Sequence, residues 1–184
     1  KSTLFPLNKR IANALQVISK TFAKAFELLQ REIGLPQVGP WLVDSPVHAV
    51  TRLQCYNDYA STHDIEPLTI FTKLDFVEMY PSFNLSEVRD SIMNITKKCA
   101  DLFFNGSLVI HVTTRTATIL DEQPTNGCTF FDIPTLDAAI KAVFENQEFK
   151  VCNSILNQTN GLVQGSNFAS QAADMYLLWM EYKY

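Results

Sequence analysis

The chain has 184 residues, of which 47% are hydrophobic, and this composition allows a core of one or two structural units. Charged residues make up only 18%, below the typical share of about 25%, which together with 13 phenylalanines indicates a surface partly covered by other molecules. The net charge of -4 excludes a general attraction to phosphate, so contact with nucleic acid needs local basic patches or a partner that supplies them.

The first part of the chain is predicted to be helical. Apolar residues recur at three- and four-residue spacing from Leu7 to Ile33, which predicts one long helix that Gly34 ends. A connector rich in proline and glycine follows, and a second helix is expected from Ser45 to Ala60. Its inward-facing residues are predicted to be Val47, Val50, Leu53 and Tyr56.

The remainder is predicted to mix strands with helices. Leu68 to Phe76 is rich in strand-forming residues and is expected to be a strand with Asp75 near its C-terminal end. Asn84 followed by Glu87 is typical of a capping box, so a helix is expected from there to about Phe103. Further elements are strands at 108–112 and 116–120, a turn at 123–128, a helix at 135–145, a hairpin at 148–158 and a helix at 168–183. This order predicts an α+β fold with a small antiparallel sheet packed with helices.

The cysteines and the hydropathy limit the setting of the chain. Four widely spaced cysteines form no Cys-x-x-Cys pair and no cluster with histidine, which argues against a zinc site. We expect four buried thiols in a reducing compartment, and therefore an intracellular protein of either the nucleus or an organelle. No apolar run reaches the roughly 18 residues that cross a membrane, so no membrane partner is expected.

Asp75 is the candidate catalytic residue. A carboxylate at the tip of a buried strand is costly unless it binds something, and hard cations such as Mg²⁺ prefer carboxylate oxygens. The neighbouring Phe76 carbonyl would supply one more oxygen ligand. Nucleotidyl transfer uses two such ions, each stabilising one side of an in-line displacement. The sequence therefore predicts a Mg²⁺ site at Asp75 and Phe76.

A glycine-containing segment near the C-terminus, residues 158–166, is a candidate for close approach to a substrate. Gly161 and Gly165 can adopt backbone conformations that other residues avoid. The side-chain amide of Gln164 offers both donors and acceptors to a nucleotide or a templating base. Ser166 follows directly, before the last predicted helix.

Read together, the segments 73–83 and 158–166 resemble motifs A and B of a reverse transcriptase. The residues that carry the resemblance are Asp75, Tyr80, Gln158, Gly161, Gln164, Gly165 and Ser166. The resemblance implies that Tyr80 is a steric gate beneath the sugar ring, which admits deoxynucleotides in preference to ribonucleotides. Gln164 and Gly165 would contact the same nucleotide. The alternative for Tyr80 is a core aromatic that stabilises the turn.

The approach to the second segment runs from Phe149 to Asn153 and continues with Gln158, Gly161, Gly165 and Ser166. This approach is most similar to that in Penelope-like elements and telomerase. This implies a fingers-like helical region at 1–67 and a palm-like region at 68–184, with a small β insertion at about 107–128. It also implies two Mg²⁺ ions and an RNA template with a DNA primer. The residues that it places against the template and primer are Gln158, Gly161 and Ser166.

The third motif of the family, a Tyr-x-Asp-Asp loop with further carboxylates, is absent before Tyr184. The chain begins at Lys1 and ends within a helical pattern, so we expect a piece of a longer polypeptide. We expect an RNA-directed DNA polymerase fragment, inactive alone, that a partner or a missing C-terminal portion completes. One alternative is a catalytically inactive, RNA-binding scaffold of a ribonucleoprotein. Another is an unrelated α+β binding domain.

Overall fold

The computed structural model describes residues 5–34, 40, 46–66, 78–113, 115–120, 130–163 and 165–184. Three predicted site residues lie outside these ranges, namely Asp75, Phe76 and Gln164. The predicted strand at 68–76, the turn at 123–128 and the boundary between residues 67 and 68 also lie outside them.

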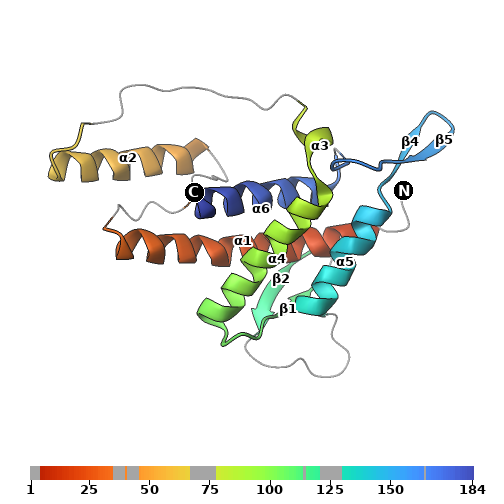
Figure 1. Cartoon of the computed structure of the whole chain (residues 1–184), viewed down its shortest axis with the longest axis horizontal. Helices are drawn as coiled ribbons and strands as arrows, with labels where there is room; N and C mark the ends of the chain where they lie inside the picture. The colour runs from red at the N-terminus through yellow and green to blue at the C-terminus, as the bar shows by residue number, and fades with distance from the viewer. Residues whose placement is uncertain are drawn as a thin grey trace.

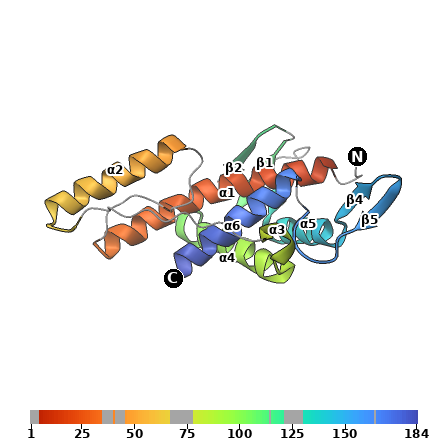
Figure 2. The same ribbon diagram turned by 90° about the horizontal axis from the view of Figure 1, so that it is seen from above.

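Three long helices form the body of the molecule: α1 (Phe5–Glu32), α4 (Leu85–Phe103) and α6 (Asn167–Lys183). Each packs against the other two, and Figures 1 and 2 show α6 lying along α1. The apolar spacing that predicted α1 is the spacing of its buried face, which confirms that prediction. Fully buried side chains in this core include Ile11, Leu15, Ile18, Phe22, Ile92, Ile95, Phe168 and Met175.

Side-chain caps fix where the helices begin. The Asn84 side chain accepts hydrogen bonds from the amides of Ser86 (3.0 Å) and Glu87 (3.5 Å), as its place in the predicted capping box requires. Ser166 caps α6 by accepting from the Ala169 amide at 3.0 Å. Both caps lie beside the segments that the sequence singled out, so these segments are joined to rigid helices.

A three-stranded antiparallel sheet lies beside α1. Its central strand is β1 (Val109–Val112), flanked by β2 (Ala117–Leu120) and by β3 (Phe130–Asp132). Ile110 stands opposite Ile119 on one side and Phe131 on the other. The helix α5 (Ile133–Glu145) starts directly after β3, with Asp132 as its cap. The sheet and the helices confirm the α+β class, although β3 was not predicted.

Two elements extend away from this body in Figure 1. The hairpin of β4 (Glu148–Val151) and β5 (Ser154–Asn157) confirms the predicted hairpin, and the side chains of β5 are exposed. The other element is α2 (Pro46–Thr62), where the predicted inward positions are wrong for Val47 (71% exposed) and Val50 (54% exposed), whereas Leu53 and Tyr56 are half-buried. Among the described elements none packs extensively on α2. Helical spacing identified an apolar face there but could not supply a partner for it.

The described cysteines differ in their exposure to solvent. Cys99 is buried, whereas Cys55 and Cys152 are exposed, so the expectation of buried thiols is wrong for these two. The fourth cysteine, Cys128, lies outside the described ranges. Cys55 lies on α2, where little covers it, and Cys152 lies in the tight turn between β4 and β5. None of the described helices combines the length and the apolar character that crossing a membrane requires.

Candidate functional site

The two segments that the sequence singled out are in direct contact. We call residues 158–166 the glycine loop. The amide of Leu162 in this loop donates a hydrogen bond of 2.8 Å to the carbonyl of Tyr80 in the short helix α3 (Met79–Ser82). A side chain at Gly161 would place its Cβ 2.6 Å from the Cα and 2.6 Å from the carbonyl oxygen of Pro81. Only glycine therefore allows the loop to reach α3 this closely.

Gly161 and Gly165 both use the left-handed backbone region, for which glycine is best suited. Gly161 has a φ of +73° and is buried, whereas Gly165 has a φ of +89° and is exposed with open space around it. Ser166 follows Gly165 as the cap of α6. The loop is thus anchored to α3 at Gly161 and Leu162, in its middle, and to α6 at Ser166, its last residue.

Gln147, between α5 and β4, holds the loop from the opposite side. Its side chain is buried, with Nε2 donating to the Gly161 carbonyl at 2.9 Å and Oε1 accepting from the Val163 amide at 3.0 Å. Its backbone carbonyl accepts from the Gln158 amide at 2.9 Å. Sequence reasoning did not find Gln147, because nothing local distinguishes it from an exposed glutamine before a strand.

The side chain of Gln158 bonds within the loop. Its Nε2 donates to the Asn160 carbonyl at 2.7 Å, which closes a turn of the chain. Gln158, Gly161 and Ser166 therefore each have a part in shaping the loop. Their predicted contacts with template and primer stay predictions.

Tyr80 begins a row of aromatic rings that leads to α6. Its half-buried ring packs edge to face on Phe83, with 6.4 Å between the ring centroids. Phe83 packs in the same manner on Tyr176 of α6, at 5.3 Å. This packing gives the Tyr80 ring a defined position, and the residue as a whole is half-buried. Its predicted role as a steric gate stays a prediction.

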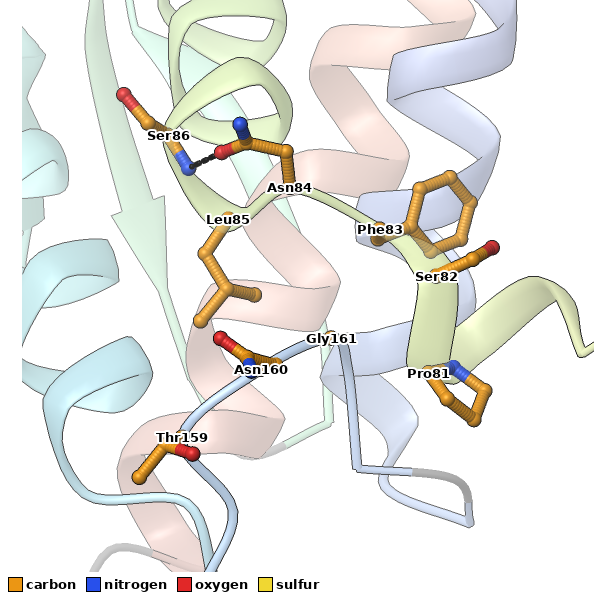
Figure 3. Close-up of a pocket in the computed structure, with 9 residues that line it drawn as sticks. All are labelled: Pro81, Ser82, Phe83, Asn84, Leu85, Ser86, Thr159, Asn160 and Gly161. Atoms are coloured by element: carbon orange, nitrogen blue, oxygen red, sulfur yellow. Dashed lines mark hydrogen bonds between the residues drawn. The ribbon is translucent and has the colours of Figure 1, made fainter.

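A cavity of about 540 Å³ lies where the glycine loop passes the start of α4 (Figure 3). In Figure 3 residues 81–86 line one side and residues 159–161 the other. Hydroxyl and amide groups from both segments are available there, from Ser82, Asn84, Ser86, Thr159 and Asn160. Its volume falls within the range of roughly 300–1,000 Å³ that is usual for small-molecule sites.

A second, smaller cavity of about 330 Å³ lies on the side of α3 that faces α6. Its lining includes the aromatic rings of Phe83 and Tyr176 together with the carboxylate-bearing Glu87. The two cavities share Ser82, Phe83 and Asn84, so they flank the connection between α3 and α4.

An ion pair holds α4 against α5. Arg89 donates to both carboxylate oxygens of Asp137, from Nε and from Nη2, each at 2.7 Å. This bidentate hydrogen bonding raises the pKa of the Arg89 guanidinium above its usual value. The pair fixes the first turns of α4, which line the cavity, relative to the helix that leads to Gln147.

The residues that the structure describes do not by themselves form a metal centre. They contain no group of three or more His, Cys, Asp or Glu side chains placed to hold an ion. Glu78, the acidic residue next to α3, is exposed. The predicted Mg²⁺ ligands Asp75 and Phe76 lie outside the described ranges, so the ion site stays a prediction.

A scan of protein-family models and searches of curated proteins and of solved structures found no match to this chain. Function is therefore inferred from the motifs and from the contacts between them.

Proposed function

We propose that this chain is the fingers and palm part of a reverse transcriptase, of the Penelope-like or telomerase type. Its reaction would be RNA-directed DNA synthesis by two-metal nucleotidyl transfer, with the third motif supplied by a partner or by a further portion of the polypeptide. The observation that carries the proposal is the contact between α3 and the glycine loop. The segment that follows Asp75 meets the segment that contains Gln164, although the two are far apart in sequence.

The contact supports a shared substrate site for a geometric reason. Gly161 is tight against the backbone of Pro81, so the loop cannot shift relative to α3 without breaking this packing. Tyr80 takes part in the contact through its carbonyl, and Gly165 follows along the loop; the resemblance assigns the nucleotide to both. Positioning of reactants supplies most of the catalysis in phosphoryl and nucleotidyl transfer, so a rigid contact here is functionally useful.

A second candidate function is an inactive scaffold that binds RNA within a ribonucleoprotein. It is favoured by the large apolar side chains that remain exposed on α2 and on the β4–β5 hairpin, such as Val47 (71%) and Ile155 (71%). Such side chains fit a chain that partners cover. This candidate needs the same fold but no metal at Asp75.

Primer extension separates the two functions. The complete polypeptide or reconstituted complex that contains this chain is assayed for deoxynucleotide incorporation on an RNA template, with Mg²⁺. Asp75→Asn is expected to abolish incorporation. Asp90→Asn, which changes an exposed carboxylate on α4, is the matched control and is expected to retain it. Equal synthesis by both variants would exclude the role of Asp75, and RNA binding without any synthesis would favour the scaffold.

The steric gate has its own test in the same assay. Tyr80→Ala removes the ring and is expected to increase the use of ribonucleotides relative to deoxynucleotides. Tyr80→Phe keeps the ring and its packing on Phe83, and is expected to retain the discrimination. If Tyr80→Ala discriminates as the wild type does, Tyr80 is a core aromatic only.

A further inference from the structure

Gln147 makes an unusual set of contacts for a residue outside the glycine loop. Only 7% of its surface is exposed, so its amide is removed from water and needs both a donor and an acceptor partner. It has both, the Gly161 carbonyl at 2.9 Å and the Val163 amide at 3.0 Å. We propose that Gln147 is a positioning residue, which holds Gly161 to Val163 in place so that the exposed Gly165 further along the glycine loop is presented to a nucleotide. The inference rests on the proposed function.

The pattern of hydrogen bonds explains how one side chain does this. Gly161 and Val163 bond to Gln147, while Leu162 between them bonds through its amide to Tyr80 on the other side. The hydrogen bonds of successive residues therefore point to opposite sides of the segment, as they do in a β-strand that is paired with a neighbouring strand on each side. No described strand lies beside this segment, and the amide of Gln147 takes the place of one. The Leu162 side chain, with 1% exposure, anchors the segment in the core.

The place where these bonds stop gives the functional consequence. Val163 is the last residue held by Gln147, and Gln164 is the next along the chain. On the far side, Gly165 is open and Ser166 is fixed as the cap of α6. Gly165 therefore lies between two anchors, Val163 and Ser166, and depends on both for its position. Gln147 does not need to touch the substrate, because it acts through the backbone of the loop.

The first experiment tests whether Gln147 holds the glycine loop, and it needs no assay of enzymatic activity. Amide hydrogen exchange is measured on the chain and on Gln147→Leu, a variant of similar size that lacks both hydrogen-bonding groups. Exchange at Val163 is expected to accelerate at least about tenfold, because a protecting bond is lost. Exchange at Leu162, which bonds to the Tyr80 carbonyl, is expected to change less. Equal protection of the Val163 amide in both proteins would show that Gln147 does not hold the loop, whether or not the chain belongs to a polymerase.

The second experiment tests positioning in the complete polypeptide or reconstituted complex. Gln147→Leu is expected to raise KM for the deoxynucleotide by about tenfold or more, while the affinity for primer and template is unchanged. The control is Gln16→Leu, the same substitution at an exposed position of α1, which is expected to leave KM unchanged. An unchanged KM in Gln147→Leu, or an equal rise in the control, would refute a positioning role. If the wild-type protein incorporates no nucleotide, the proposed function fails. Hydrogen exchange at the Val163 amide still tests whether Gln147 holds the glycine loop.

Discussion

Gly161→Ala tests the contact between α3 and the glycine loop most sharply. The new Cβ would lie 2.6 Å from two backbone atoms of Pro81 and still closer to the Tyr80 carbonyl oxygen, separations that real Cβ atoms essentially never show. Backbone atoms of a short helix cannot rotate aside as the end of a flexible side chain can. Either the loop or α3 must therefore move, and the bond from the Leu162 amide to the Tyr80 carbonyl is then lost.

Three contributions give the size of the effect. A left-handed backbone, with φ of +73° at Gly161, costs an alanine roughly 1–2 kcal/mol. Overpacking of a tight site typically costs about 1–3 kcal/mol, and loss of one hydrogen bond about 1 kcal/mol. These terms are partly alternatives, since a loop that moves away relieves the clash. We therefore expect the free energy of unfolding to fall by about 3–4 kcal/mol.

Urea unfolding followed by circular dichroism measures this loss, and Gly165→Ala is the matched control. Gly165 also has a positive φ, +89°, but an added Cβ there meets nothing within 4 Å. Its replacement should cost only the backbone term of roughly 1–2 kcal/mol. If the two variants lose the same stability, the close approach of the loop to α3 is not present in solution.

Three further predictions concern the surroundings of the site. Asp137→Asn weakens the bidentate bond to Arg89 and should lower the free energy of unfolding by about 1 kcal/mol in urea titrations. A double-mutant cycle that shows no coupling between Arg89 and Asp137 would contradict a stabilising ion pair. Hydrogen bonds from the side chain and the backbone amide of Thr135 lower the pKa of Asp132 in the folded chain. The carboxylate of Asp132 therefore stabilises the fold fully above its unfolded pKa near 4, and this stabilisation is lost as pH falls through the lower folded pKa. Asp132→Asn should flatten this part of the acid dependence of the unfolding midpoint, and an unaltered profile would refute the assignment. Burial raises the pKa of Cys99 to about 12, so its thiol should stay unmodified when the folded chain is alkylated at neutral pH. Mass spectrometry should find the exposed Cys55 and Cys152 modified under the same conditions. Equal labelling of Cys55, Cys99 and Cys152 would show that the core around Cys99 is open.

Local signals in the sequence were sufficient for most helices. The three- and four-residue apolar spacing of α1 marks the face that the core buries, and Asn84 starts α4 because its side chain caps the first turn. The hairpin at β4 and β5 and the helix α6 were found in the same way. In each case the determining interactions lie within a few residues, so a single sequence contains them.

Features that depend on distant partners were not predictable. Strand β3 has three residues and exists because it pairs with β1, to which no local pattern points. The apolar face of α2 was expected to be inward, but Val50 is 54% exposed since no described element covers it. Gln147 looks like any polar residue between a helix and a strand, and its role appears only when the glycine loop folds back on it.

The same distinction applies to the candidate site. Gly161 was expected to allow a close approach, and the structure shows a close approach of the loop to α3. Sequence alone could not tell whether the missing side chain makes room for a substrate or for the chain itself. The predicted site residues Asp75, Phe76 and Gln164 lie outside the described ranges, so their convergence still rests on the motifs.

A crystal structure with Mn²⁺ and a deoxynucleoside triphosphate tests that convergence most directly, because manganese replaces Mg²⁺ and its anomalous scattering locates the ion. We predict an ion bound to the carboxylate of Asp75, with the nucleotide held between Tyr80 and the glycine loop near Gln164. An ion bound elsewhere, or Asp75 and Gln164 on opposite faces of the molecule, would contradict the proposed function.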